Sequence, residues 1–201
     1  MFTIAPASSA DVPAAASVLA SAFANDTVMG TLIDGQYKES RLARLFRALM
    51  RTGALRTGRI DLTRRDTDGG LLGAAIWEPP GRHFSLLDQA RELPSFVRAL
   101  GWGGLGRAVR IQRTLAHHRP AEPHWYLAQI GVSAEARGMG VGSALLESRL
   151  EQIDAEGLPA YLESSNERNR ALYRRHGFES IASIDRIPNA SPTGMWRAAR
   201  C

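Results

Sequence analysis

A glycine-rich turn between a predicted strand and a predicted helix constrains this chain more than any other feature. Residues 125–132 are aromatic and β-branched enough for a buried strand, and apolar residues recur at helical spacing from Leu146 to Ile153. Between them lies the sequence Arg-Gly-Met-Gly-Val-Gly at 137–142. Three residues without a Cβ allow backbone amides to point into one concavity at a helix start, where the helix dipole favours an anion. The stretch 129–153 therefore predicts a cradle for a phosphate or pyrophosphate group.

Two other phosphate-binding motifs do not match this turn. The loop of nucleoside triphosphatases closes with a lysine before Ser or Thr, whereas Gly142 is followed directly by Ser143. The dinucleotide fingerprint needs Gly-x-Gly-x-x-Gly, whereas the glycines of the turn stand at alternate positions. Residues 101–106 do have that spacing, but they follow a predicted helix at 93–100 rather than a strand. We interpret them as a bend between two helices.

The turn resembles the Gln/Arg-x-x-Gly-x-Gly/Ala signature of the GNAT superfamily of N-acetyltransferases through Arg137, Gly140 and Gly142. Residues 161–178 resemble the second signature of that family, which is a strand, an Asn-rich helix start and a tyrosine ahead of Gly-Phe. Two signatures in the family's order make the resemblance specific. Within the superfamily, the run 118–127 that leads into the turn is similar to puromycin-type acetyltransferases.

The resemblance implies that acetyl-coenzyme A is the acyl donor, bound as a cosubstrate with its pyrophosphate on the loop amides. An extended pantetheine arm can also hydrogen-bond an exposed strand edge as another strand would. The expected binding residues belong to the strand end, the loop and the downstream helix: Ile130, Gly131, Val132, Arg137, Gly138, Met139, Gly140, Val141, Gly142, Ser143, Asn166, Asn169 and Tyr173.

Tyr173 is the candidate general acid. Attack of an amine on a thioester expels a thiolate, to which a nearby phenol can deliver a proton. Asn169 and Tyr173 stand four residues apart, so they share one face of a helix that Ser165 or Asn166 would cap. In the family, the counterpart of Asn169 holds the pantetheine while the tyrosine reaches the sulfur. The alternative is a core tyrosine that packs beside Phe178.

Glu163 and Glu78 are the candidate general bases. An alkyl ammonium must lose a proton before it attacks, and a carboxylate or a chain of water molecules can accept that proton. Glu163 lies on the strand next to the motif helix, and Glu78 ends a predicted hairpin. The alternative for both is a solvated or ion-paired glutamate at a strand end.

Composition and charge exclude several other classes. A chain of 201 residues, 44% of them hydrophobic, suits one domain, and no apolar run is long enough for a membrane span. The sole cysteine, Cys201, cannot form an internal disulfide, so we expect a cytoplasmic location. The net charge of +5 comes from dispersed arginines without a nucleic-acid-binding signature, so no nucleic-acid partner is expected. The histidines lack metal-ligand spacing, and no Gly-x-Ser-x-Gly elbow is present.

The remaining segments predict the outer elements of one domain. We expect a strand at 2–4 and a helix from Val12, an amphipathic helix at 39–51, a hairpin of strands at 60–64 and 71–77, a helix at 107–117, and a closing strand at 195–199. The helical insertion 80–118 is long for a connection between two strands and is our candidate substrate lid.

These observations predict a single domain over residues 1–201 with an α/β (α+β) GNAT fold, in which helices flank a mixed, largely antiparallel twisted sheet. The expected reaction moves an acetyl group from acetyl-coenzyme A to a primary amine of a small molecule by direct attack in a ternary complex. Two alternatives stay open: a protein N-terminal or lysine acetyltransferase, and a non-catalytic acyl-coenzyme A sensor. No metal and no membrane are expected as partners, and a homodimer is left open.

Overall fold

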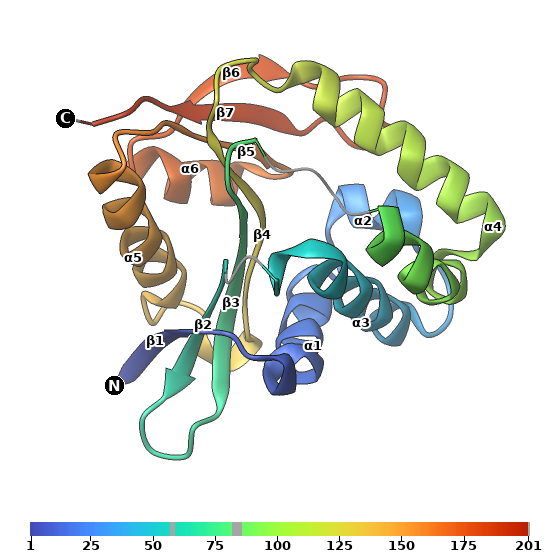
Figure 1. Ribbon diagram of the computed structural model, residues 1–201, viewed down its shortest axis with the longest axis horizontal. Helices are drawn as coiled ribbons and strands as arrows, with labels where there is room; N and C mark the ends of the chain where they lie inside the picture. The colour runs from blue at the N-terminus through green and yellow to red at the C-terminus, as the bar shows by residue number, and fades with distance from the viewer. Residues whose placement is uncertain (57–58, 82–85, 201) are drawn as a thin grey trace.

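A seven-stranded sheet runs through the computed structural model, which describes residues 1–56, 59–81 and 86–200 (Figure 1). The strand order is β1-β2-β3-β4-β5-β7-β6, and every neighbouring pair is antiparallel except β4 and β5. The strands are β1 (Phe2–Pro6), β2 (Ile60–Arg65), β3 (Leu71–Glu78), β4 (Trp125–Val132), β5 (Ala160–Ser164), β6 (Glu179–Ser183) and β7 (Thr193–Arg197). The predicted α/β architecture with a mixed, largely antiparallel sheet is confirmed.

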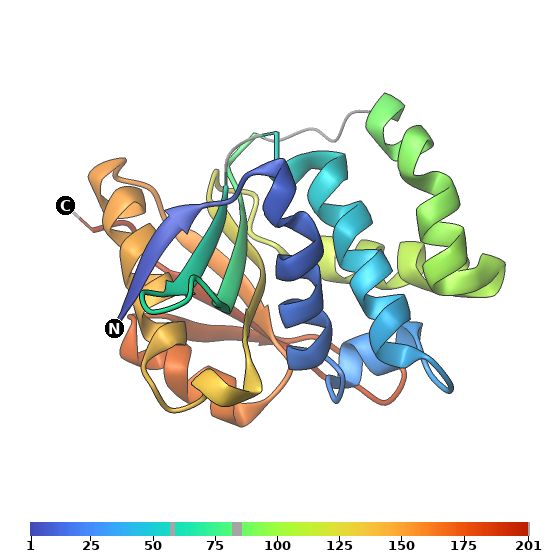
Figure 2. The same ribbon diagram turned by 90° about the horizontal axis from the view of Figure 1, so that it is seen from below.

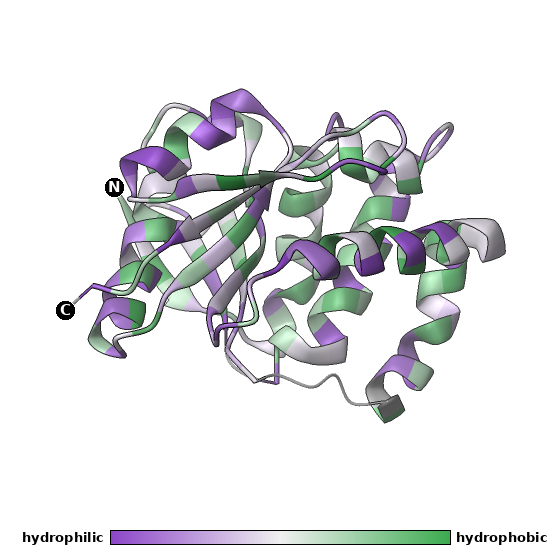
Figure 3. Cartoon of the chain, turned by 90° about the horizontal axis from the view of Figure 1, so that it is seen from above, coloured by the Kyte–Doolittle hydropathy of each residue, from purple (hydrophilic) through white to green (hydrophobic). Residues whose placement is uncertain are grey.

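Helices cover both faces of this sheet (Figure 2). One apolar core lies between the sheet and the first four helices, and a second lies between the sheet and the last two. Hydrophilic and hydrophobic residues alternate along the helices, as expected when one side of each is buried (Figure 3). The helices are α1 (Val12–Ala22), α2 (Thr27–Leu32), α3 (Lys38–Leu49), α4 (Leu86–His118), α5 (Val141–Ala155) and α6 (Glu167–Arg175), with a π-helical turn at Met50–Ala54 after α3. Within the described residues, no helix is both long and apolar enough to cross a membrane.

The bend in α4 is shorter than predicted. The sequence suggests a break over 101–106, but only Gly101 leaves the helical region, with φ 71° and ψ 166°, and the helix resumes at Trp102. A positive φ is accessible to glycine without steric cost, so one residue suffices for the turn. Arg41 on α3 donates from Nε to the carbonyl of Ala99 at 2.8 Å, which holds the end of the first half of α4 in place.

Three short elements also differ from the sequence predictions. The closing strand runs from Thr193 to Arg197 rather than over 195–199, because its pairing with β5 begins at Ser164 opposite Thr193. The six-residue helix α2 is too short for apolar periodicity to reveal it. The edge strand β6 was not located from sequence because it is largely exposed and lacks a buried apolar alternation.

The parallel pair β4 and β5 is joined over only three residues. Cα partners run from Trp125 opposite Ala160 to Leu127 opposite Leu162, and the two strands then diverge. On the other side of β4, the register with β3 shifts between Ile76 and Trp77. The second half of β4 therefore keeps β3 as a neighbour but has no strand beside it on the β5 side. This divergence opens the sheet at the carboxyl ends of two parallel strands.

Two glycines beside this opening allow helices to approach the sheet closely. A Cβ at Gly73 on β3 would lie 2.9 Å from Val141 of α5. A Cβ at Gly131 on β4 would lie 2.8 Å from the Cβ of Ala22 and 3.0 Å from Leu19, both on α1. Real Cβ contacts are longer than this, so a side chain at either position would push a helix away from the sheet.

We expect Gly131→Ala to lower the free energy of unfolding by about 1–3 kcal/mol, because overpacking forces α1 off β4. Thermal and urea unfolding would measure the loss. Gly106→Ala is the matched control, since a Cβ there meets nothing within 4 Å. On α4 it should instead stabilise the protein by about 0.5–1 kcal/mol through helix propensity. Equal effects of the two substitutions would contradict the close approach of α1.

Candidate active site

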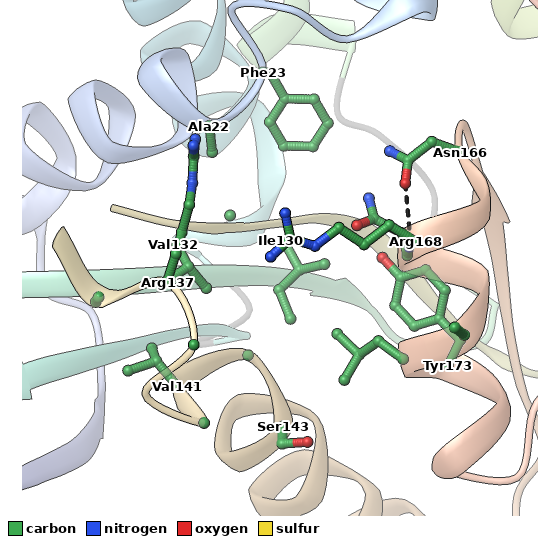
Figure 4. A pocket seen from close by; sticks show the side chains of 18 of the residues that line it. Ala22, Phe23, Ile130, Val132, Arg137, Val141, Ser143, Asn166, Arg168 and Tyr173 are labelled. Carbon is green, nitrogen blue, oxygen red and sulfur yellow. Dashed lines mark hydrogen bonds between the residues drawn. The ribbon is translucent and has the colours of Figure 1, made fainter. Parts of the chain in front are cut away.

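A cleft of about 940 Å³ occupies the opening between β4 and β5. Four segments line it, as Figure 4 shows for 18 of the residues: the end of α1 with the loop into α2, the second half of β4, the glycine turn with the start of α5, and α6. Its lining includes every predicted cofactor residue except Met139, which is 56% exposed. Segments separated by more than a hundred residues are thus brought to one cavity.

The glycine turn presents unpaired amides to this cleft. Gly138 and Gly140 have φ values of 82° and 80°, and Gly140 is the N-cap of α5 without a side-chain cap. The first helical hydrogen bond runs from the amide of Ala144 to the carbonyl of Gly140 at 3.0 Å. The three preceding amides, of residues 141–143, therefore have no carbonyl within the helix to bind. An anion such as a pyrophosphate fits this arrangement, since both the amides and the helix dipole favour it.

Three arginines add positive charge to the lining. Arg137 comes from the glycine turn, and Arg168 and Arg175 come from α6. Figure 4 shows Arg168 reaching across the cleft toward Ile130, while Arg137 extends toward Ala22. Sequence reasoning named Arg137 alone, because the other two fall in an arginine-rich helix where a solvated face is the ordinary expectation. A polyanionic ligand would meet charge from both walls.

A histidine lies behind the phosphate cradle. The Nε2 of His176 is 2.9 Å from the Oγ of Ser143, which lines the cleft in the first turn of α5. Burial lowers the pKa of His176, with Arg175 on α6 and Arg197 on β7 acting in the same direction and Glu147 on α5 acting against it. The imidazole is therefore neutral at pH 7. Sequence reasoning treated the histidines only as metal ligands and missed this contact.

Helix α6 is capped as the sequence suggests. Asn166 is the N-cap, and its Oδ1 accepts from the amide of Asn169 at 2.9 Å, the dashed line in Figure 4. At the other end, Gly177 has φ 86°, and the amide of Phe178 donates to the carbonyl of Tyr173 at 3.1 Å. These bonds fix the orientation of the helix, and so of Tyr173, against the cleft.

Tyr173 both packs in the core and lines the cleft. Its side chain is 5% exposed, and its ring meets that of Phe178 edge-on at 6.1 Å. Burial raises the pKa of Tyr173 well above its usual value, and the negative charge of Asp26 raises it further. The phenol therefore keeps its proton at physiological pH and is available as a hydrogen-bond donor inside the cleft.

The two candidate bases lie outside the cleft lining. Glu163 is nearly buried, and its carboxylate accepts from the Nε of Arg119 at 3.1 Å and from the hydroxyl of Tyr126 at 2.5 Å. Glu78 faces Tyr126 across the β3–β4 pair, and its charge contributes to raising the pKa of both Arg119 and Tyr126. Both glutamates therefore lie near Arg119, and neither lines the cleft with Tyr173.

The loop after α1 contributes residues that sequence reasoning missed. Phe23, Asn25 and Asp26 line the cleft. Asp26 also caps α2, accepting from the amide of Met29 at 2.8 Å. An Asp directly before a short apolar helix is a cap signal that could have been recognised. The position of Asp26 in the cleft could not have been recognised from sequence, because it depends on how α1 packs against β4.

None of the described residues of α4, which forms most of the predicted insertion, lines the cleft, so this helix lies beside the site rather than in it. It packs on α3 and α2 instead. Its role as a substrate lid stays a prediction. The described residues also contain no group of three or more His, Cys, Asp or Glu side chains placed to hold a metal ion.

A known protein family matches the part of the chain that forms most of the cleft. The family model of the acetyltransferase (GNAT) family matches residues 74–178, which span just over half of the chain. The chain belongs to the GNAT acetyltransferase family. The matched region contains β4, the glycine turn, α5, β5 and α6, and so most of the cleft.

Three relatives differ in how much of the chain they match. An uncharacterized N-acetyltransferase of Schizosaccharomyces pombe is 46% identical over 60 residues, which cover 30% of this chain and about a quarter (24%) of that protein. A crystal structure of histone acetyltransferase HPA2 and related acetyltransferase from Corynebacterium glutamicum has a TM-score of 0.79 at 29% identity, covering 100% of this chain and 97% of that chain. A Drosophila melanogaster polyamine N-acetyltransferase has a TM-score of 0.63 at 12% identity, with 98% of each chain covered, and shows the shared fold alone.

We expect Gly140→Asp to weaken coenzyme A binding by about 100-fold or more, because it adds a negative charge where charge-assisted hydrogen bonds form. Isothermal titration calorimetry would measure the change. Gly157→Asp is the matched control: Gly157 also has a positive φ, 64°, with open space around it, but it follows the far end of α5. The control should keep wild-type affinity, and equal affinity in both variants would remove the cradle assignment.

We expect coenzyme A to bind more tightly as the pH falls through the pKa of His176, which lies below its ordinary 6.5. Protonation adds a positive charge behind Ser143, and the gain should be about three- to tenfold. Because the phosphates of the ligand also titrate, the measurement is the difference between wild type and His176→Gln, which keeps a side chain able to bond Ser143. Identical pH profiles of the dissociation constant would show that His176 does not act on the cradle.

Proposed function

We propose that this acetyltransferase moves an acetyl group from acetyl-coenzyme A to a primary amine of a small molecule. The observation that carries the proposal is that one cleft joins an anion cradle to a buried, protonated phenol. A cofactor with a phosphate end and a reactive thioester end needs these two features at a distance from each other. The volume of about 940 Å³ is also in the range of small-molecule sites.

The chain's own residues have distinct parts in this proposal. The amides of residues 141–143, together with Arg137, would hold the pyrophosphate. The open side of β4, from Ile130 to Val132, offers a strand edge to the amide-bearing arm. Asn169 and Tyr173 line the other wall. When bound, acetyl-coenzyme A supplies an activated acyl group as a thioester, and the protein positions it and supplies a proton.

Direct attack by the amine is favoured over a covalent acyl-enzyme. Among the described residues that line the cleft, the hydroxyl nucleophiles are Ser21, Ser143 and the phenol Tyr173, and no cysteine is present. Ser143 lies in the phosphate cradle, away from the reacting end. Its hydroxyl contacts His176, but no carboxylate holds that imidazole in place by a hydrogen bond, because the nearest oxygen of Glu147 is 3.9 Å from Nδ1 of His176. The amine itself is therefore the nucleophile in our proposal.

Two related structures indicate different classes of acceptor. Drosophila polyamine N-acetyltransferase, which forms N-acetylagmatine, shares the fold and acts on a small amine, whereas the more similar Corynebacterium structure carries a histone acetyltransferase name. An acceptor panel that follows free-thiol release would separate these cases, with small primary amines in one arm and lysine-containing and N-terminal peptides in the other. Release with peptides alone would replace the small-molecule proposal. The cytoplasmic location, the likeness to puromycin-type enzymes and a homodimer stay predictions.

We expect Tyr173→Phe to lower turnover by about 100-fold, within the usual range for a positioned acid, with coenzyme A affinity nearly unchanged. The substitution keeps the ring, and so the contact with Phe178, and removes only the hydroxyl. The raised pKa of Tyr173 makes it a hydrogen-bond donor to the developing thiolate over a wide pH range. Full activity at saturating acetyl-coenzyme A, with chemistry shown to be rate-limiting, would remove Tyr173 from the mechanism.

A further inference from the structure

Asp26 is the sole carboxylate among the described residues that line the cleft. Three arginines line the same cavity, so most of its charge favours an anionic ligand. A carboxylate in such a cleft would weaken the binding of an anionic ligand unless the carboxylate lies away from the ligand's phosphates. Asp26 lies in the loop between α1 and α2, on the wall that also holds Phe23, and its charge acts on the phenol of Tyr173. It therefore belongs to the reacting end.

The carboxylate of Asp26 is held in a fixed orientation. Its Oδ1 accepts from the amide of Met29 at 2.8 Å, and its Oδ2 accepts from the hydroxyl of Ser165 at 2.5 Å. Ser165 stands between β5 and α6, so this bond links the α1 side of the cleft to the α6 side. An ionised carboxylate offers about four acceptor positions, and these two contacts use two of them. The others can accept hydrogen bonds from a ligand.

Capping α2 does not by itself account for a negative charge at this position. Asn is as effective as Asp at an N-cap, and Asn166 caps α6 in this chain with a bond of the same kind at 2.9 Å. An Asn at this position would make the same cap without a charge, so the charge of Asp26 is left for a cationic ligand group. The other candidate carboxylate, that of Glu163, is instead engaged by Arg119 and Tyr126.

We propose that Asp26 binds the ammonium group of the acceptor and so selects acceptors whose reacting end is cationic. The inference rests on the proposed acetyl transfer to an amine and adds to it the residue that recognises the acceptor. An ammonium has three N–H donors, which a fixed carboxylate can bind by charge-assisted hydrogen bonds. Asp26 then holds the nitrogen near the hydroxyl of Tyr173, where the thiolate is expected to leave. The bound ammonium loses one proton to solvent water before its nitrogen attacks, and the departing thiolate takes up the proton that Tyr173 donates, which solvent then replaces.

The test uses two isomeric amines, 2-phenylethylamine, which is an alkyl ammonium at neutral pH, and 4-ethylaniline, which is uncharged. Binding of each to the coenzyme A-loaded protein is measured by calorimetry, and turnover by thiol release from acetyl-coenzyme A. Asp26→Asn should weaken the binding of 2-phenylethylamine by about 10- to 100-fold and raise its Michaelis constant in proportion, because the substitution removes a charge-assisted contact. The constants of 4-ethylaniline and the affinity for coenzyme A should not change. Asp34→Asn removes the same charge from an exposed position outside the cleft and should behave as wild type.

The two measurements separate the two proposals. Absence of thiol release with every amine would refute the acetyl transfer, while the dissociation constants would still decide the role of Asp26. An equal loss for both isomers in Asp26→Asn would show a structural role alone. Wild type that binds 2-phenylethylamine no better than 4-ethylaniline would also overturn the inference.

Discussion

The cleft exists because β4 and β5 diverge after three paired residues. Two parallel neighbours normally stay hydrogen-bonded along their length, since an unpaired backbone edge is costly when it is buried. Here the pairing ends after Leu127 and Leu162, and the second half of β4 has an open side. The open edge is tolerable only because it lines a cleft, where water or a ligand can satisfy it. The same divergence of strands therefore explains both the shape of the sheet and the position of the cleft.

The helices around the opening give the cleft its polarity. The start of α5 brings unpaired amides and a positive dipole end to one region, and α6 brings arginines and a phenol to the opposite wall. Gly73 and Gly131 let α5 and α1 approach the two faces of the sheet at this point. A cleft that is lined by three arginines and by Asp26 can orient a ligand that has a polyanionic part and a cationic neighbour.

The buried charges elsewhere have a different physical character. Glu163 accepts hydrogen bonds from both Arg119 and Tyr126, and the guanidinium of Arg119 lies 3.6 Å from the centre of the Tyr126 ring. Such a network holds β4, β5 and the residues after α4 in register, and breaking one partner leaves an uncompensated charge. Glu163 therefore belongs to this network, and its role as a general base stays a prediction. The carboxylate of Asp26 instead lines the cleft, where its bonds to Met29 and Ser165 use two of about four acceptor positions.

Several parts of the site could be predicted from local chemistry along the chain. The glycine turn at 137–142, the cap at Asn166 and the spacing of Asn169 and Tyr173 depend on φ preference, side-chain reach and helical period, all of which are encoded within a few residues. Contacts between groups far apart in the chain became visible in the folded structure alone. It placed Asp26 and Arg168 in the cleft and His176 behind Ser143, and it moved Glu163 and Glu78 to a separate cluster. The physical reason is that these pairings are set by where two strands part and how closely helices pack on a sheet, and neither leaves a periodic or local signal along the chain.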